Sequence, residues 1–187
     1  MNEDTKRLFV GVPLSKEIKK ILPVAKECLQ PFHKYLRWVP ERNLHITLSF
    51  LGSVPVNQIQ DLCENLESTV QSRFFPIEIR GSGVFPSPKT PKVFWLGVGE
   101  GRTELKKLHH EVNETTAPFK GTGKKTGYAP HITIARTKGI PRKIDVLPFL
   151  NIVYSPVEFM INSINLYESV LMPGGSQYTI LNEFPLH

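Results

Sequence analysis

Hydrophobic and polar residues alternate in two short stretches of the chain, at residues 45–50 and 131–136. Both stretches are apolar, rich in β-branched residues and periodic in two, which predicts strands. Successive side chains of a strand point to opposite faces. Each stretch is therefore expected to present a histidine and a threonine on one face. The opposite face of the first stretch is expected to hold Ile46, Leu48 and Phe50.

The shared polar pair is His45 with Thr47 in the first copy and His131 with Thr133 in the second. Ile132 and Ile134 back the second pair. A single histidine in a strand is usually structural. Two copies of His-x-Thr in one small chain indicate a function, because such a pair is costly to bury without partners.

The remaining pattern predicts further strands and helices in each half of the chain. A helix is expected from Lys16, with Ser15 as its cap and either a kink or an early break at Pro23. The other expected helices span 57–72 and 103–115, and the other expected strands span 8–12, 75–80, 93–98, 157–161, 164–168 and 178–184.

Each half thus contains a strand, a helix and a His-x-Thr strand. Phe9 precedes His45, and Phe94 precedes His131, by nearly the same number of residues. We therefore predict an α+β fold of two pseudo-symmetric β-α-β-like lobes, with the two motifs facing each other across a cleft. No long linker interrupts the chain, so residues 1–187 are expected to form one domain of intertwined lobes.

Composition narrows the class of protein only slightly. The 187 residues carry a formal net charge of +6, which favours a polyanionic partner but by itself indicates only non-specific attraction. Cys28 and Cys63 form no CxxC pair, and the chain shows neither a signal peptide nor a membrane span, so a cytoplasmic protein is expected. The glycine-rich stretch 81–91 is expected to be a loop, and it lacks the spacing of a phosphate-binding P-loop.

Two facing histidines suit general acid–base catalysis, one taking a proton while the other gives one. The threonine hydroxyls beside them are able to donate hydrogen bonds to an anionic oxygen. The set is suited to a phosphate group under in-line attack. Metal binding is the alternative, but a catalytic zinc usually takes three protein ligands, and neither motif holds a third. No cofactor is expected, and His33, His109, His110 and His187 are expected at the surface.

The stretches NLHITLSFLG, residues 43–52, and PHITIAR, residues 130–136, resemble the two signature motifs of the 2H phosphoesterase superfamily. Over its full length the chain is similar to the RNA 2′,3′-cyclic phosphodiesterases, a family also called 2′-5′ RNA ligases. The segments that carry this likeness include RLFVGVPL, GSGVFPSPKTPKVFWLGV and LYESVLMPGGSQYTILNEFPL.

The resemblance implies a bilobed α+β fold with antiparallel sheets flanking a central cleft. It implies metal-independent hydrolysis of an RNA 2′,3′-cyclic phosphate to a 2′-phosphomonoester, together with reversible 2′-5′ RNA ligation by the same acid–base pair. His131 would be the proton acceptor and His45 the proton donor, while Thr47 and Thr133 would hold the non-bridging oxygens. The resemblance also implies a monomer that binds RNA. The rival hypothesis is an RNA-binding module that uses the cleft without turnover.

Further residues are expected at the substrate. Arg136 matches the arginine of the second motif and would offset phosphate charge, although strict alternation puts it on the far face from His131. A bulge or a strand end would have to redirect it. Phe9 and Tyr128 are candidates for the cleft, with core packing as the alternative. Lys124, Lys125 and Lys138 are candidates for the RNA backbone, with a solvated loop as the alternative.

Overall fold

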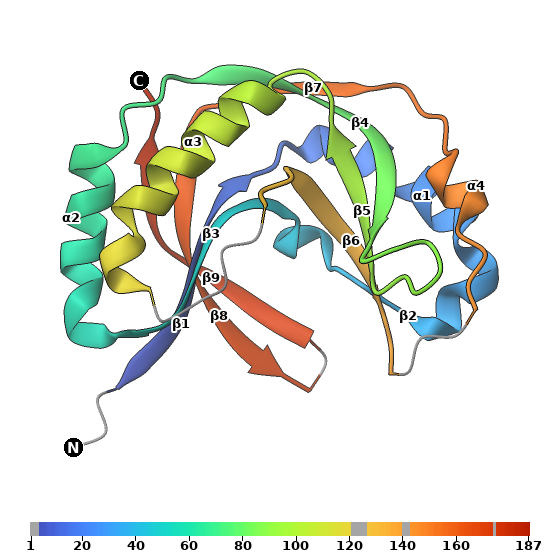
Figure 1. The fold of residues 1–187 in the computed structure, drawn as a ribbon, viewed down its shortest axis with the longest axis horizontal. Coiled ribbons are helices and arrows are strands. Elements are labelled where there is room, and N and C mark those ends of the chain that lie inside the picture. Colours follow the sequence, from blue (N-terminus) through green and yellow to red (C-terminus); the bar gives the residue numbers. More distant parts are fainter. Residues whose placement is uncertain (1–3, 121–126, 140–142, 174) are drawn as a thin grey trace.

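The structure, a computed structural model, describes residues 4–120, 127–139, 143–173 and 175–187. Among these residues nine strands form one curled antiparallel sheet in the order β7-β4-β5-β6-β3-β1-β8-β9, with β2 paired to β6 (Figure 1). The first lobe consists of β3 (His45–Pro55), β1 (Thr5–Pro13), β8 (Ser163–Met172) and β9 (Gly175–Pro185). The second lobe consists of β6 (His131–Thr137), β5 (Val93–Val98), β4 (Phe75–Phe85), β7 (Val157–Ile161) and β2 (Leu36–Trp38).

Within the sheet, the described strands of the two lobes pair through one residue pair, Ile46 of β3 and Ile132 of β6. The expected α+β fold with antiparallel strands and two related lobes is confirmed, with the sheets of the lobes joined into one. β7 and β8 follow each other with only Asn162 between them, yet they pair in different lobes. This crossing helps to hold the curled sheet together.

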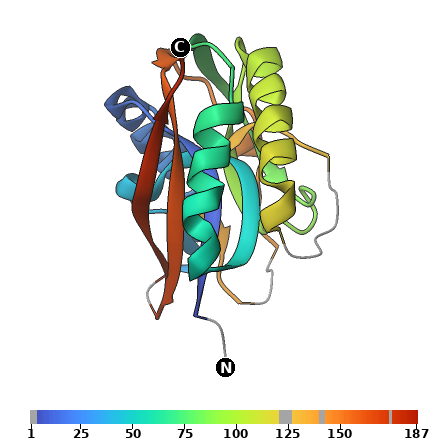
Figure 2. The same ribbon diagram turned by 90° about the vertical axis from the view of Figure 1, so that its left-hand side faces the viewer.

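Helices cover each lobe. Two of the helices pack on a different lobe from the one that contains the strand before them in the chain. α2 (Ile59–Thr69) contacts β9, and α3 (Arg102–Thr115), which follows β5 of the second lobe, contacts β3 of the first. α1 (Leu22–Cys28), which follows β1, contacts α4 (Leu147–Leu150), and α4 packs on β4 of the second lobe. Figures 1 and 2 show α2 and α3 side by side over the first lobe. The helices therefore tie the lobes together.

Short 3-10 helices join the main elements. They are η1 (Lys16–Lys20), η2 (Gln30–Tyr35), η3 (Glu41–Asn43), η4 (Val56–Gln58) and η5 (Ala117–Phe119). The long helix expected from Lys16 is divided into η1 and α1. Ser15 caps η1 by accepting a hydrogen bond from the backbone of Glu17, as expected. Of the two alternatives at Pro23, the early break is confirmed. Pro23 lies in the first turn of α1, where a missing N–H costs nothing, and so it begins a second helix instead of kinking one long helix.

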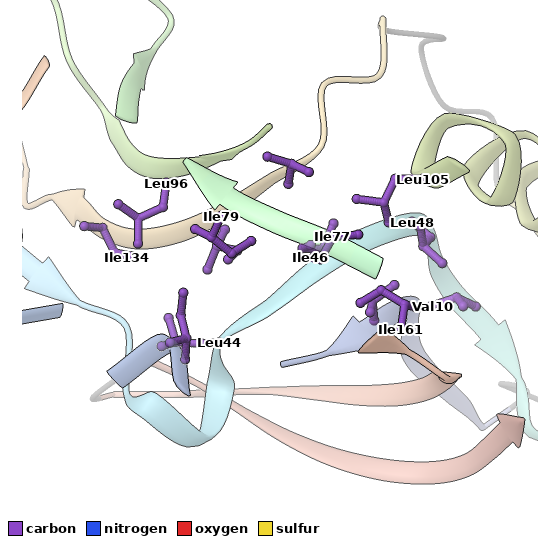
Figure 3. Close-up of a cluster of buried hydrophobic side chains, with 14 of the residues drawn as sticks. Val10, Leu44, Ile46, Leu48, Ile77, Ile79, Leu96, Leu105, Ile134 and Ile161 are labelled. Atoms are coloured by element: carbon purple, nitrogen blue, oxygen red, sulfur yellow. The ribbon is translucent and has the colours of Figure 1, made fainter. Parts of the chain in front are cut away.

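The core lies behind the two motif strands. Ile46, Leu48, Ile132 and Ile134 are all almost fully buried, at 0, 2, 0 and 1% exposure. Figure 3 shows Ile46 and Leu48 in one cluster with Ile77 on β4 and Leu105 on α3. Burial of one such aliphatic side chain contributes about 1.5–3 kcal/mol. The apolar face of each motif therefore anchors the strand that carries the histidine. No helix of the described residues is both long and apolar enough to cross a membrane.

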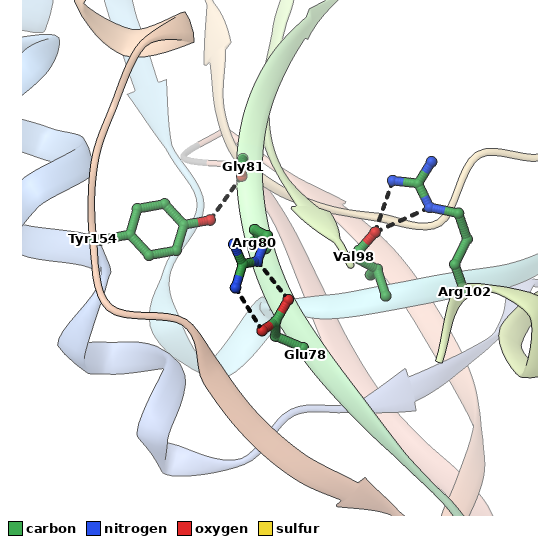
Figure 4. Close-up of polar contacts among 6 residues, drawn as sticks. All are labelled: Glu78, Arg80, Gly81, Val98, Arg102 and Tyr154. Carbon is green, nitrogen blue, oxygen red and sulfur yellow. Dashed lines mark hydrogen bonds and ion pairs between the residues drawn. The ribbon is translucent and has the colours of Figure 1, made fainter. Parts of the chain in front are cut away.

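β4 continues beyond the expected strand and takes in the first half of the stretch expected as a loop. It does so through a bulge between Ile79 and Ser82, where Gly81 has a φ of +75°. The Tyr154 hydroxyl donates a 2.7 Å hydrogen bond to the carbonyl of Gly81, and burial raises the pKa of Tyr154 to about 12 (Figure 4). Arg80 forms a two-pronged ion pair with Glu78 beside it. The hydrogen bond from Tyr154 thus supports the backbone of the second lobe at this bulge.

Candidate active site

A cavity of about 460 Å³ lies between the lobes, and both motifs line it. His45, Thr47, His131 and Thr133 all contribute to its wall. The described residues of the lining include the cations Arg7 and Arg136 and no Asp or Glu; the other lining residues are Leu8, Phe9, Val39, Asn43, Phe50, Gly52, Phe85, Val93, Ser169, Leu171, Ser176 and Tyr178. The cavity is therefore suited to an anion. Two further hollows on the outer surfaces of the lobes contain neither motif.

The two motifs meet crosswise at the Ile46–Ile132 pair. Since the strands run antiparallel there, His45 lies on the same side of the pair as Thr133, and Thr47 on the same side as His131. All four side chains line the same cavity. One tetrahedral group at the centre of this arrangement would be within reach of two imidazoles and two hydroxyls.

Each imidazole is held by the backbone carbonyl two residues before it. Nδ1 of His45 lies 2.7 Å from the carbonyl oxygen of Asn43, and Nδ1 of His131 lies 2.7 Å from that of Ala129. A carbonyl only accepts, so Nδ1 donates in both rings, and in the neutral tautomer Nε2 carries the lone pair. The Nε2 of His45 also lies 2.9 Å from the hydroxyl of Thr47. Both rings therefore present to the cavity the nitrogen that takes or gives a proton.

Asn43 was not singled out from the sequence. Its buried side chain donates a 2.7 Å hydrogen bond to the carbonyl of Ser176, near the turn of the β8–β9 hairpin. The residue that orients His45 is therefore itself held by the hairpin that forms one wall of the cavity. Only the tertiary structure brings these two segments together.

Burial lowers the pKa of both catalytic candidates. The pKa of His45 falls from 6.5 to about 4, chiefly through desolvation and to a lesser extent through the charges of His131 and Arg136, against the hydrogen bond to Asn43. The pKa of His131 is also lowered, first by desolvation and then by the charge of Arg136. Both imidazoles are therefore neutral at pH 7 in the free protein.

Aromatic rings enclose each imidazole, which explains the desolvation. The ring of His45 lies 4.7 Å from that of Phe9 and 5.4 Å from that of Tyr178. The ring of His131 lies 5.1 Å from that of Phe85 and 6.1 Å from that of Trp95. Phe9 therefore lies at the cavity. The cleft was one of the two positions expected for it, and core packing was the other.

A β-bulge brings Arg136 to the cavity. Thr133 pairs with Trp95 and Ala135 with Phe94, so Ile134 has no partner on β5. The extra residue reverses the alternation, and Ile134 and Ala135 are both buried while Arg136 is exposed at the cavity. This resolves the conflict between strict alternation and the expected role of the arginine.

The first motif contains the same bulge, and here one prediction was wrong. Thr47 pairs with Gly11 and Ser49 with Val10, which leaves Leu48 without a partner on β1. Phe50, expected behind the motif with Leu48, is therefore turned to the cavity and is 70% exposed. Phe50 occupies the position in the first copy that Arg136 occupies in the second.

At each bulge, the backbone carbonyl of the residue without a partner accepts a hydrogen bond from another part of the chain, and the donor differs between the two bulges. The Ile134 oxygen accepts a 2.9 Å hydrogen bond from the backbone of Val39. The Leu48 oxygen accepts a 2.7 Å hydrogen bond from Nδ1 of His109 on α3. His109 is thus half-buried and not at the surface as expected, and it supports the strand that carries His45.

Tyr128 does not line the cavity. Its ring stacks on that of His109 at 3.8 Å, among partly buried residues packed on the core. Lys138 is exposed, does not line the cavity and donates to the carbonyl of Lys34 at 3.4 Å. Lys124 and Lys125 lie outside the described residues. No cluster of three or more His, Cys, Asp or Glu residues suited to hold a metal ion is found in the described part of the chain.

The sequence profile of the 2′-5′ RNA ligase superfamily matches residues 14–170. The chain belongs to the 2′-5′ RNA ligase superfamily. An RNA 2′,3′-cyclic phosphodiesterase of Aquifex aeolicus is 37% identical over 186 residues, which cover 96% of this chain and 97% of the relative. An RNA 2′,3′-cyclic phosphodiesterase of Thermotoga maritima is 34% identical over 178 residues, which cover 95% and 94%. These relatives confirm the family predicted from the two motifs, and with it the prediction of an enzyme.

Solved structures of the superfamily share the fold. TT0787 of Thermus thermophilus is 29% identical, with a TM-score of 0.78 over 96% of this chain and 97% of that one. E. coli LigT complexed with 3′-AMP is 22% identical, with a TM-score of 0.76 over 98% and 99%. The second likeness concerns the fold alone. Both likenesses thus support the curled-sheet fold of this chain.

Proposed function

We propose that the protein hydrolyses RNA 2′,3′-cyclic phosphate ends to 2′-phosphomonoesters by two-histidine acid–base catalysis. The observation that carries the proposal is the matched pair of imidazoles, each with Nδ1 on a backbone carbonyl and both lining one cavity that contains cations and no carboxylate among its described lining. The names of the relatives support the substrate class.

In the proposed reaction His131 takes a proton from water as the water oxygen bonds to phosphorus. The bond from phosphorus to O3′ breaks, and His45 gives its proton to O3′, so that a 3′-hydroxyl and a 2′-phosphate result. A positioned proton-transfer group contributes about 10²–10⁴-fold in rate. Thr47 and Thr133 would hold the non-bridging oxygens, and Arg136 would offset their charge. 2′-5′ ligation, in which a 5′-hydroxyl takes the place of water and bonds to phosphorus while O3′ leaves, would use the same two groups.

The low pKa of His45 sets a condition on this assignment. A neutral imidazole gives no proton, so the anionic substrate must raise the pKa of His45 when it enters the cavity, as an opposite charge at contact distance does. The assignment of donor and acceptor follows the resemblance of the motifs. Both imidazoles are neutral in the free protein, so their protonation states fit either assignment of the two roles.

A leaving group that needs no proton separates the two roles. With a p-nitrophenyl phosphodiester, His45→Ala is expected to lose far less activity than with a cyclic nucleotide, because nitrophenolate leaves unprotonated. His131→Ala is expected to lose as much on both substrates, since water activation is needed in each case. The opposite pattern would exchange the two roles.

The rival candidate, an RNA-binding module without turnover, predicts binding but no product. Incubation with a nucleoside 2′,3′-cyclic phosphate and with an oligonucleotide ending in one, followed by separation of the 2′- and 3′-monoesters, distinguishes the two. A 2′-monoester is expected. If neither substrate yields a monoester, the proposed activity is wrong and the binding module is favoured.

A further inference from the structure

β2 occupies the edge of β6 that faces the first lobe. β5 pairs along the other edge of β6, and the described part of β3 pairs with β6 through Ile46 and Ile132. Beyond that pair β2 takes the place of β3, from Ala135 to Thr137. β2 therefore adjoins the stretch of β6 that brings Arg136 to the cavity.

Two guanidinium side chains come from directly opposite positions on these strands. Arg37 of β2 pairs with Arg136 of β6. Opposite residues of an antiparallel pair point to the same face, with Cα atoms about 4.5–5.5 Å apart. The next residue, Leu36, is buried on the other face. Arg37 is exposed and does not line the cavity, so it lies on the face of Arg136 but one strand further out.

The aliphatic part of Arg37 lies near the β8–β9 hairpin of the first lobe. A Cβ atom built on Gly175 would lie 4.0 Å from Cδ of Arg37. The following residue, Ser176, lines the cavity and accepts the hydrogen bond from Asn43. Arg37 is therefore at the mouth of the cavity, beside the hairpin that forms one of its walls.

No described carboxylate balances this pair of cations. Neither Arg37 nor Arg136 forms an ion pair within the part of the chain that the structure describes. The acidic residue nearest to Arg37 in the sequence, Glu41, is paired with Lys19 at 2.9 Å. Like charges directly opposite each other destabilise a sheet, so the arrangement favours bound anions. The reacting phosphate accounts for Arg136 and leaves Arg37 without an anion.

Cations continue outward from Arg37 along the same two strands. Lys138 follows the end of β6, and its amine donates a 3.4 Å hydrogen bond to the carbonyl of Lys34, which lies just before β2. Both lysines are exposed. The sequence has no Asp or Glu in the segments 34–38 and 134–138. These segments therefore present only positive charge, which suits a phosphodiester chain.

An RNA that ends in a 2′,3′-cyclic phosphate carries a second anion close to the first. This anion is the phosphodiester on the 5′ side of the terminal nucleotide, which a nucleoside 2′,3′-cyclic phosphate lacks. We propose that Arg37 binds this phosphodiester while Arg136 serves the reacting phosphate, so that the protein prefers the end of an RNA chain to a single nucleotide. A guanidinium holds a phosphodiester with two parallel hydrogen bonds. The proposal rests on the cyclic phosphodiesterase activity proposed above.

The test compares two substrates that differ by that phosphodiester. One is a nucleoside 2′,3′-cyclic phosphate, and the other is a dinucleotide that ends in the same group. Wild type is expected to have the higher kcat/KM on the dinucleotide. Arg37→Gln is expected to lower kcat/KM about tenfold on the dinucleotide and far less on the nucleoside, because one charge-assisted contact is lost. Arg37→Lys is expected to lie between.

A dinucleotide with a neutral methylphosphonate linkage removes the charge from the substrate instead of the protein. Wild type is expected to have a kcat/KM about tenfold lower on it than on the charged dinucleotide. The loss caused by Arg37→Gln is expected to disappear on the neutral substrate, since the two changes remove the same contact. On the charged dinucleotide, the slope of log kcat/KM against log salt is expected to be shallower by about 0.7 in Arg37→Gln, the value for one contact to a single strand.

Two further arginine variants serve as comparisons. Arg73 is exposed and does not line the cavity, so Arg73→Gln removes one positive charge elsewhere and is expected to change neither substrate. Arg7 lines the cavity from β1 of the first lobe. If Arg7→Gln abolishes the preference for the dinucleotide and Arg37→Gln does not, the RNA chain leaves along the first lobe and the inference is overturned.

The remaining outcomes separate this inference from the proposed activity. If wild type hydrolyses neither substrate, the activity is wrong and the inference falls with it. If wild type hydrolyses both and Arg37→Gln lowers kcat/KM equally on the two, Arg37 serves the reacting phosphate and the inference alone is overturned. An unchanged preference in Arg37→Gln, shown to be folded by circular dichroism, has the same consequence. The methylphosphonate comparison in wild type needs no variant, and equal rates on its two dinucleotides would also overturn the inference.

Discussion

Replacement of His45 is expected to change how the stability of the protein depends on pH. In the unfolded chain this imidazole has a pKa near 6.5, and in the folded protein desolvation lowers the pKa to about 4. Between these values the unfolded chain binds a proton that the folded protein does not bind. The free energy of unfolding therefore falls as the pH falls through this window.

The size of the effect follows from the two pKa values. One unit is worth 1.36 kcal/mol, so the shift from 6.5 to about 4 amounts to about 3 kcal/mol. This is an upper value, because the residue as a whole keeps some exposure to water in the cavity. His45→Asn removes the titrating ring while its amide retains a donor near the place of Nδ1, toward the carbonyl of Asn43.

The assay is urea denaturation at fixed ionic strength, at steps from pH 7.5 to pH 4. Wild type is expected to lose up to about 3 kcal/mol more than His45→Asn over this range. The carboxylates titrate in both proteins and cancel in the comparison. A proton NMR titration of the His45 ring checks the pKa directly. Parallel stability curves, or a ring that titrates near 6.5, would refute the reasoning.

Four further results are expected. The pH profile of kcat/KM is a bell that peaks below pH 6.5, because the pKa values of both His45 and His131 are lowered in the free enzyme. In steady-state kinetics, the folded variants His45→Ala and His131→Ala each have a kcat lowered by about 10²–10⁴-fold. The double variant loses far less than the product of the two single losses, because the two residues act as a unit. Thr47→Val or Thr133→Val raises the activation free energy by at most about 2–4 kcal/mol. Activity survives a strong chelator, and loss that zinc restores would contradict acid–base catalysis by the imidazoles alone. His109→Phe, which leaves the carbonyl of the first bulge unpaired, destabilises the fold by about 1–3 kcal/mol in urea, whereas His109→Asn keeps the donor and costs less.

Alternation in the sequence was sufficient to place the candidate catalytic side chains on one face of each strand, but not to find their surroundings. It put His45 and Thr47 on one face with Ile46 and Leu48 behind, and the structure has this arrangement. The family resemblance added the antiparallel sheet. Asn43 and His109 were missed because their roles depend on contacts with Ser176 and with the Leu48 carbonyl, which no local pattern encodes.

The predicted correspondence of the two halves was right, but the residues matched between them were wrong by one position. Phe9 was matched to Phe94 by its distance from the motif, but the register pairs Phe9 with Phe50 and Val93 with Arg136, so Val93 is its counterpart. Phe94 is fully buried in the core. Counting along the chain fails here because the segments that lead to β3 and β6 differ, while the register of the strands does not.

The bulges left a signal in the sequence that strict alternation overlooks. Leu48-Ser49 and Ile134-Ala135 each place two small or apolar residues in succession where a period of two requires one. Such a doublet in a strand that is otherwise regular is what an extra residue on one face looks like. Once it is allowed for, the sixth residue of each copy returns to the face of the histidine. The motif then includes Phe50 and Arg136, the position at which the two copies of an otherwise symmetric site differ most in charge.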